Sequence, residues 1–165
     1  MVKASPPTDP SLARDTEDLY DALEDLLRVY QFRDRDRICC FDVSVSQCYA
    51  LEGLVRRGAM TLNDLAAHLY LDKSTASRVV DALERKGYVA RTPHPTDGRS
   101  LLLEATDEGR ALEGTIRESI LAEERQLLSD FAPDVRKSMT ELIRRLARAA
   151  SASVEAGGGS CCRIP

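Results

Sequence analysis

The chain has 165 residues, 43% hydrophobic and 30% charged, which is typical of a folded globular domain and excludes a chain that is disordered throughout. Its net charge of −4 argues against a protein that binds nucleic acid through a wholly basic surface. No stretch approaches the roughly 20 apolar residues that a membrane helix needs, and residues 1–15 lack the apolar core of a signal peptide. We therefore expect a cytoplasmic protein that does not bind membranes.

The first predicted element is an amphipathic helix that begins near residue 12, after a proline-containing segment (1–11) that we expect to be flexible. Apolar residues recur along it at steps of three and four: Leu12, Leu19, Leu23, Leu26, Leu27 and Tyr30. This pattern predicts a helix that ends near Arg33. A second helix is predicted from Ser44, whose spacing to Gln47 is that of a capping box, to Gly58.

Two short helices joined by a tight turn are predicted next. Thr61 and Asp64 repeat the capping-box spacing and start the third helix. Asp72 is placed to cap a fourth helix that ends at Gly87 and carries an apolar face made of Val79, Val80 and Leu83. This arrangement is the outline of a helix-turn-helix.

After the fourth helix the periodicity changes from helix to strand. Residues 88–92 and 99–105 are β-compatible, and the loop between them contains Asp97-Gly98, a hairpin signal because both residues tolerate positive φ. These runs predict a two-stranded wing. Two more helices are predicted, one capped at Thr106 and one beginning at Pro133.

The elements together predict a mainly α (α+β) fold, a winged helix-turn-helix flanked by helices. We assign residues 44–106 to a DNA-binding domain, and residues 12–43 and 107–155 to a helical dimerisation region. Residues 156–165 begin with a glycine-rich linker and are expected to form a flexible tail that contains cysteines.

Basic and hydroxyl-bearing side chains gather on the fourth helix and the hairpin. Residues 72–99 hold six basic and four acidic residues, a net +2, so the rest of the chain carries −6. Hydroxyls and a guanidinium in the first turns of a helix can reach phosphates or base edges in a major groove, and an arginine on a hairpin can enter a minor groove. The predicted DNA contacts are Lys73, Ser74, Thr75, Ser77, Arg78, Arg91, Asp97 and Arg99. The alternative is that the hydroxyls only start the helix and that Asp97 only forms the turn.

Several of these motifs resemble the MarR family of transcriptional regulators in order and spacing, over roughly residues 12–150. The motifs are Leu65-Ala66, the run Asp72-Lys73-Ser74-Thr75-Ala76-Ser77-Arg78 with its continuation to Val89, Asp97-Gly98-Arg99-Ser100, and Thr106-Asp107-Glu108-Gly109. The resemblance implies an obligate homodimer whose first, fifth and sixth helices interlock and whose two winged lobes dock on a pseudo-palindromic operator in double-stranded DNA. The apolar faces of those helices suit such an interface. The chain departs from many members at the hairpin tip, where Asp-Gly-Arg lacks a middle arginine, so one backbone contact is in doubt.

The five cysteines bear on the signal, or effector, that would release such a regulator from DNA. Members of this family are usually repressors released by a small molecule or by thiol oxidation. An odd count without an export signal predicts free thiols. Cys39 and Cys40 precede the second helix, and Cys161 and Cys162 follow the glycine linker, so four thiolates from two chains could bind a soft ion: As(III), Sb(III), mercury, Cu(I) or zinc. Cys48 lies on an apolar helix face and is expected to be structural.

Other functions stay open at this point. The cysteine pairs could instead form a redox switch or have no role, in which case an organic effector would release the repressor. A thiol-rich cytosolic metal carrier is a candidate from another class, but a carrier has no use for the predicted hairpin. His68 and His94 lack ligand spacing and are expected at the surface or near DNA. No catalytic motif occurs, so we expect no enzyme, and DNA binding requires no cofactor.

Overall fold

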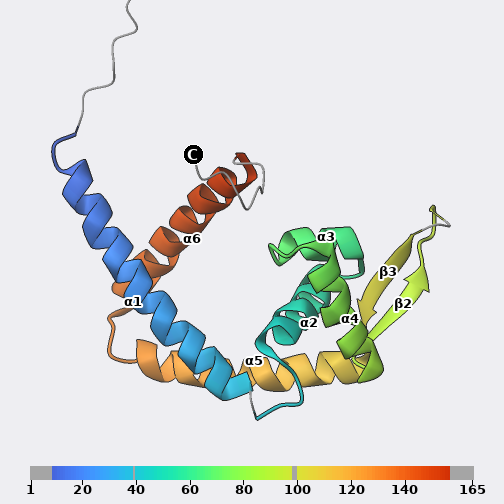
Figure 1. The fold of residues 1–165 in the computed structure, drawn as a ribbon. Helices are drawn as coiled ribbons and strands as arrows, with labels where there is room; N and C mark the ends of the chain where they lie inside the picture. Colours follow the sequence, from blue (N-terminus) through green and yellow to red (C-terminus); the bar gives the residue numbers. More distant parts are fainter. Residues whose placement is uncertain (1–8, 39, 98–99, 157–165) are drawn as a thin grey trace, which may run out of the picture. The chain divides into compact units, whose positions relative to one another are not determined.

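The computed structural model describes residues 9–38, 40–97 and 100–156 (Figure 1). The chain divides into two compact units, Met1–Glu118 and Ser119–Pro165. The elements in order are α1 (Leu12–Ile38), α2 (Val45–Arg57), β1 (Met60–Thr61), α3 (Leu62–His68), α4 (Lys73–Arg85), β2 (Val89–Pro93), β3 (Leu101–Ala105), α5 (Asp107–Leu128) and α6 (Pro133–Ala156). The mainly helical fold with a small sheet is the predicted one. Across the described residues, no helix is both long and apolar enough to cross a membrane.

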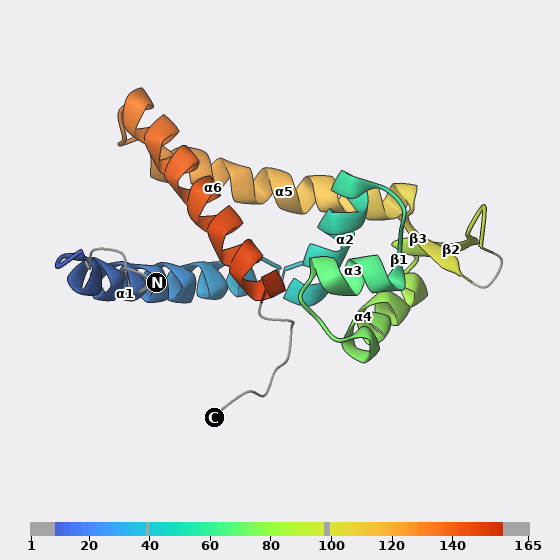
Figure 2. The same cartoon turned by 90° about the horizontal axis from the view of Figure 1, so that it is seen from above.

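The winged lobe consists of α2, α3, α4 and the sheet, and its β2–β3 hairpin extends beyond its helices in both ribbon views (Figure 2). β2 and β3 pair antiparallel with Val89 opposite Ala105. The predicted two-stranded wing was incomplete, because β1 adds a third strand that pairs with β3 and puts Met60 opposite Leu103. Two residues are too few for an alternating pattern, so β1 left no strand signal in the sequence.

The core of the first unit lies mostly inside this lobe. Apolar side chains from α2, α3, α4 and the sheet are buried together: Cys48, Ala50, Leu51, Leu54, Leu65, Ala66, Ala76, Val80, Leu83, Val89, Leu103 and Ala105. From outside the lobe, α1 contributes Ile38, the connection that follows contributes Val43, and α5 contributes Ile116. Burial of this set stabilises the lobe by the hydrophobic effect.

The helix boundaries in the lobe follow the predicted caps. Ser44 and Thr61 each form a complete capping box, with Gln47 and Asp64 respectively. Gly87, with φ of +79°, follows the end of α4, and the Tyr88 amide donates to the Leu83 carbonyl. Because a glycine adopts this left-handed conformation without a Cβ penalty, the chain can leave the helix and enter β2.

The first helix is longer than the sequence predicted, because α1 continues past Arg33 to Ile38. The last residues of α1 are mostly charged and break the apolar period, yet arginine is a good helix former and cations favour a helix C-terminus. The Arg33 guanidinium lies 4.0 Å from the centre of the Tyr30 ring. Ile38 then anchors the end of α1, since it is almost fully buried.

The start of α5 is fitted against the end of α4. Thr106 caps α5 by accepting from the Gly109 amide at 3.0 Å, and its hydroxyl donates to the Gly87 carbonyl at 2.7 Å. A Cβ on Gly109 would collide with the Tyr88 carbonyl oxygen. This close approach holds the wing sheet, the end of α4 and the start of α5 together.

Helices α1 and α6 differ from the lobe because their apolar faces are exposed. On α1 the exposed apolar side chains are Leu12, Leu19, Tyr20, Leu26, Leu27, Val29 and Phe32, and on α6 they are Val135, Leu142, Ile143 and Val154. Pro133 begins α6, as predicted. The assignment of these helices to dimerisation stays a prediction within a single chain.

Candidate nucleic-acid interface

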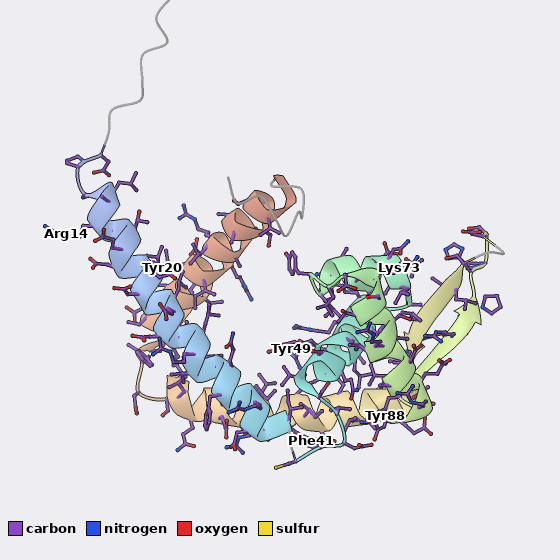
Figure 3. The ribbon with its side chains drawn as sticks, viewed as in Figure 1. Arg14, Tyr20, Phe41, Tyr49, Lys73 and Tyr88 are labelled. Carbon is purple, nitrogen blue, oxygen red and sulfur yellow. The ribbon has the colours of Figure 1, made fainter. Side chains whose placement is uncertain are left out.

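Helix α4 has a buried face and an exposed face. Ala76, Val80 and Leu83 are buried in the lobe. Lys73, Ser74 and Arg78 are exposed, and Figure 3 shows Lys73 at the N-terminal end of the helix, away from Tyr88. Neither Lys73 nor Arg78 forms an ion pair with another described residue. The exposed face therefore presents cations that a polyanion can neutralise.

Two of the predicted contact residues also form the start of α4. The Asp72 carboxylate accepts from the Thr75 amide at 2.9 Å, from the Ser74 hydroxyl at 2.5 Å and from the Thr75 hydroxyl at 2.7 Å. The hydrogen bond from the Ser74 side chain, followed by those from Thr75, holds the pKa of Asp72 well below its ordinary value. Ser74 and Thr75 thus serve the helix start.

A hollow of about 360 Å³, lined by both polar and apolar side chains, lies between α4, the start of α3 and the sheet. It is lined by Thr61, Leu62, Asn63, Lys73, Ser77, Asp81, Arg91, Ser100, Leu101 and Leu103. The structure thus brings together three of the predicted DNA contacts, Lys73, Ser77 and Arg91, beside α4.

Arg91 joins the wing to α4 by a forked contact. Its guanidinium lies 2.5 Å from Asp81 Oδ1 and 2.8 Å from Glu84 Oε2, and only 28% of its side chain is exposed. Arg91 is one of the predicted DNA contacts, and its acidic partners on α4 were not predicted. Asp81 and Glu84 are three residues apart and share one face of α4, a spacing that indicates an acidic pair able to bind a cation. The register of β2 against α4, which brings Arg91 to this pair, was not predictable from the sequence.

The tip of the wing is described only in part. Gly98 and Arg99 lie outside the described residues. Asp97 is exposed, and its amide and that of Thr96 donate to His94 Nδ1 at 3.2 and 3.3 Å. His94 therefore organises the turn that contains Asp97, a role that the sequence did not predict.

His68 lies where α3 meets α2. It is half-buried, and a Cβ on Gly53 would lie 2.8 Å from its Cδ2 atom. Burial, and then the nearby Arg57 charge, lower the pKa of His68 below its ordinary value. The contact between the two helices therefore favours a neutral ring that packs against a small residue.

Two of the five cysteines lie among the described residues, and three do not. Cys40 is exposed in the connection between α1 and α2, and Cys48 is buried on α2, as predicted. Cys39, Cys161 and Cys162 lie outside the described residues. Among the residues that are described, no three His, Cys, Asp or Glu side chains are placed to hold a metal ion.

The chain is similar in sequence to transcriptional regulators. A family model described as the MarR family matches residues 41–100. An uncharacterised HTH-type transcriptional regulator of Mycobacterium bovis is 34% identical over 137 residues, which cover 81% of this chain and 93% of that protein. The multiple antibiotic resistance protein MarR of Salmonella typhimurium is 29% identical over 106 residues, covering 60% of this chain and 74% of that protein.

Solved structures of such regulators share the fold. A MarR family protein from Bacillus stearothermophilus has a TM-score of 0.77 at 22% identity, covering 84% of this chain and 97% of that one. The protein RV1404 of Mycobacterium tuberculosis has a TM-score of 0.66 at 29% identity, covering 90% of this chain and 97% of that one. With the winged lobe and its exposed helix α4 already established, these similarities place the chain in the MarR family of transcriptional regulators.

Proposed function

We propose that this regulator is a homodimeric repressor that binds a pseudo-palindromic operator in double-stranded DNA. The recognition helix α4 would enter the major groove with Lys73, Ser74, Thr75, Ser77 and Arg78, and the hairpin would reach the minor groove with Asp97 and Arg99. The observation that carries this proposal is the exposed face of α4, where Lys73 and Arg78 form no ion pair with another described residue. Arg91, which is paired with α4, would support the wing beside that face.

The exposed apolar faces of α1 and α6 support the dimer. Leu142 and Ile143 of α6 are 62% and 57% exposed, and Phe32 of α1 is 62% exposed. Exposed apolar side chains repeated along a helix mark an interaction surface. A second copy of the chain is the partner that a pseudo-palindromic operator requires, because a two-fold protein matches a two-fold site.

The DNA-binding test uses the chain's own upstream region as duplex DNA at fixed salt. We expect Arg78→Ala to lower operator affinity about tenfold to a hundredfold, the usual effect of losing one specific contact. Arg117→Ala is the matched control, because it removes an exposed arginine from α5. If Arg78 contacts a phosphate, its loss also reduces the salt slope by about one. Unchanged operator affinity in Arg78→Ala would disprove this docking.

We also propose that a soft ion, such as As(III) or Sb(III), releases the repressor by binding cysteine thiolates. The support is the exposure of Cys40 and the sequence positions of Cys39, Cys161 and Cys162. The experiment titrates operator complexes of reduced protein with arsenite, antimonite, zinc, Cu(I) and peroxide. The variant with serine at all four positions should bind the operator normally and no longer respond.

Other results of this titration would indicate a different effector or a different class of protein. Release by peroxide alone indicates a thiol-redox switch, and operator binding that none of these reagents changes points to an organic effector. A chain that binds the ion tightly but no duplex DNA would be a metal carrier instead.

A further inference from the structure

The side chain of Lys86 connects two segments that are far apart in sequence. It donates to the main-chain carbonyl of Asp42, lies 3.0 Å from Asp42 Oδ1, and is 3.4 Å from Gln47 Oε1. An ammonium group has three donors, and three oxygens surround this one. The Lys86 side chain is only 29% exposed. These contacts are more specific than a solvated surface lysine would make.

Each end of this contact lies beside residues that helix or core contacts fix in place. The Lys86 backbone caps α4, with its amide donating to the Ala82 carbonyl at 3.3 Å, and Gly87 then turns the chain into the wing. Asp42 lies in the connection between two buried anchors, Ile38 at the end of α1 and Val43. The labelled Phe41, next to Asp42, lies toward the same end of α4 as Tyr88 (Figure 3).

Gln47 extends the contact to the start of α2. Its Oε1 atom accepts from the Ser44 amide at 3.1 Å as part of the capping box, and Lys86 approaches the same oxygen. A movement of the connection must therefore either break the contacts of Lys86 or shift the C-terminal end of α4. Because Arg91 holds the same half of α4 to the wing, such a shift would also move the wing.

We propose that Lys86 is a positioning residue for operator binding, which couples the conformation of the α1–α2 connection to the placement of α4 and the wing. This inference rests on the proposed DNA binding and adds a route by which a change near Cys40 reaches the recognition helix. Coupling is reciprocal, so operator binding must stabilise the connection by the same factor by which an ordered connection strengthens operator binding.

The experiment compares Lys86→Met with Lys86→Arg, which keeps the charge and donors. Arg85→Met is the matched control, because Arg85 is exposed on the neighbouring position and forms no ion pair with another described residue. Two quantities are measured: operator affinity over a range of salt, and hydrogen exchange of residues 40–44 with and without operator. Thermal unfolding of each variant confirms that it is folded.

We expect Lys86→Met to lower operator affinity about tenfold, within the usual range of coupling between sites, with an unchanged salt slope. Exchange in residues 40–44 should become faster, and the protection that the operator confers there should disappear. Lys86→Arg should restore both properties, and Arg85→Met should leave exchange unchanged.

Two results would overturn the proposal. A salt slope reduced by about one with unchanged exchange would make Lys86 a phosphate contact. Unchanged affinity and exchange would make the contact incidental. If the parent protein binds no duplex, the proposed function fails, whereas faster exchange in DNA-free Lys86→Met would still show that Lys86 orders the connection.

Discussion

The winged lobe and the helices α1 and α6 differ in what happens to their apolar side chains. In the lobe, Leu54, Leu65 and Leu83 are each at most 1% exposed, and every helix contributes to one core. On α1 and α6, side chains of the same chemical kind face solvent within a single chain. The lobe therefore carries its own stabilising contacts, whereas the exposed apolar faces of α1 and α6 are the surfaces that we propose a second copy of the chain covers. Substitutions in the two regions should consequently change different measurable quantities.

The largest expected effect is in the core of the lobe. Leu54→Ala removes a side chain that is 1% exposed and should lower the free energy of unfolding by about 3 kcal/mol, because it loses buried apolar area and leaves a cavity. Denaturant unfolding at constant protein concentration measures this loss. Leu101→Ala, an exposed leucine of the same lobe, should change the value by less than about 0.5 kcal/mol. Equal losses for the two variants would contradict the core described above.

The next effect tests the exposed helices. Ile143→Glu places a charge on the apolar face of α6 and should weaken dimerisation about a hundredfold, equivalent to about 2.7 kcal/mol. Sedimentation over a range of concentrations measures the dimer dissociation constant. Lys137→Glu introduces the same residue on the opposite face of α6 and should leave the dimer intact. A dimer that tolerates Ile143→Glu would exclude this face from the interface.

A smaller effect concerns the contact between the wing and α4. Arg91→Met removes both ion pairs and should lower the stability of the lobe by about 1 kcal/mol, since partly exposed pairs contribute little. Operator affinity should fall with an unchanged salt slope if Arg91 only positions the wing. A slope reduced by about one would instead support the DNA contact that the sequence suggested. Arg91→Lys should rescue only in part, because lysine cannot form the fork.

The smallest effect is the pH dependence from Asp72. Its pKa in the folded chain lies below the ordinary value of 3.8, so its carboxylate stabilises the fold above about pH 4 and that stabilisation is lost as the pH falls. Asp72→Asn can still cap α4 but does not titrate. We therefore expect the stability difference between the parent and Asp72→Asn to shrink below about pH 4 in urea unfolding. A difference that stays constant with pH would contradict the role of the carboxylate.

Much of the lobe was predictable because its signals are local. The caps at Ser44 and Thr61 depend on residues three positions away, and Gly87 ends α4 by its own backbone freedom. The exposed residues of α4 could likewise be placed from the helical period. β1 was not predictable, because its two residues become a strand only when β3 lies beside them.

The amino-acid sequence by itself determined which segments become helices and the hairpin, where most of them begin and end, and which side of α4 carries cations, since these features depend on neighbours within one or two turns. Only the tertiary structure decided that Arg91 pairs with Asp81 and Glu84, and that Lys86 reaches Asp42. Asp42 and Lys86 are 44 residues apart, and the geometry of their contact depends on how α2 and α4 pack. Contacts of this kind follow from the shape of the packed core, which no local pattern of residue types encodes.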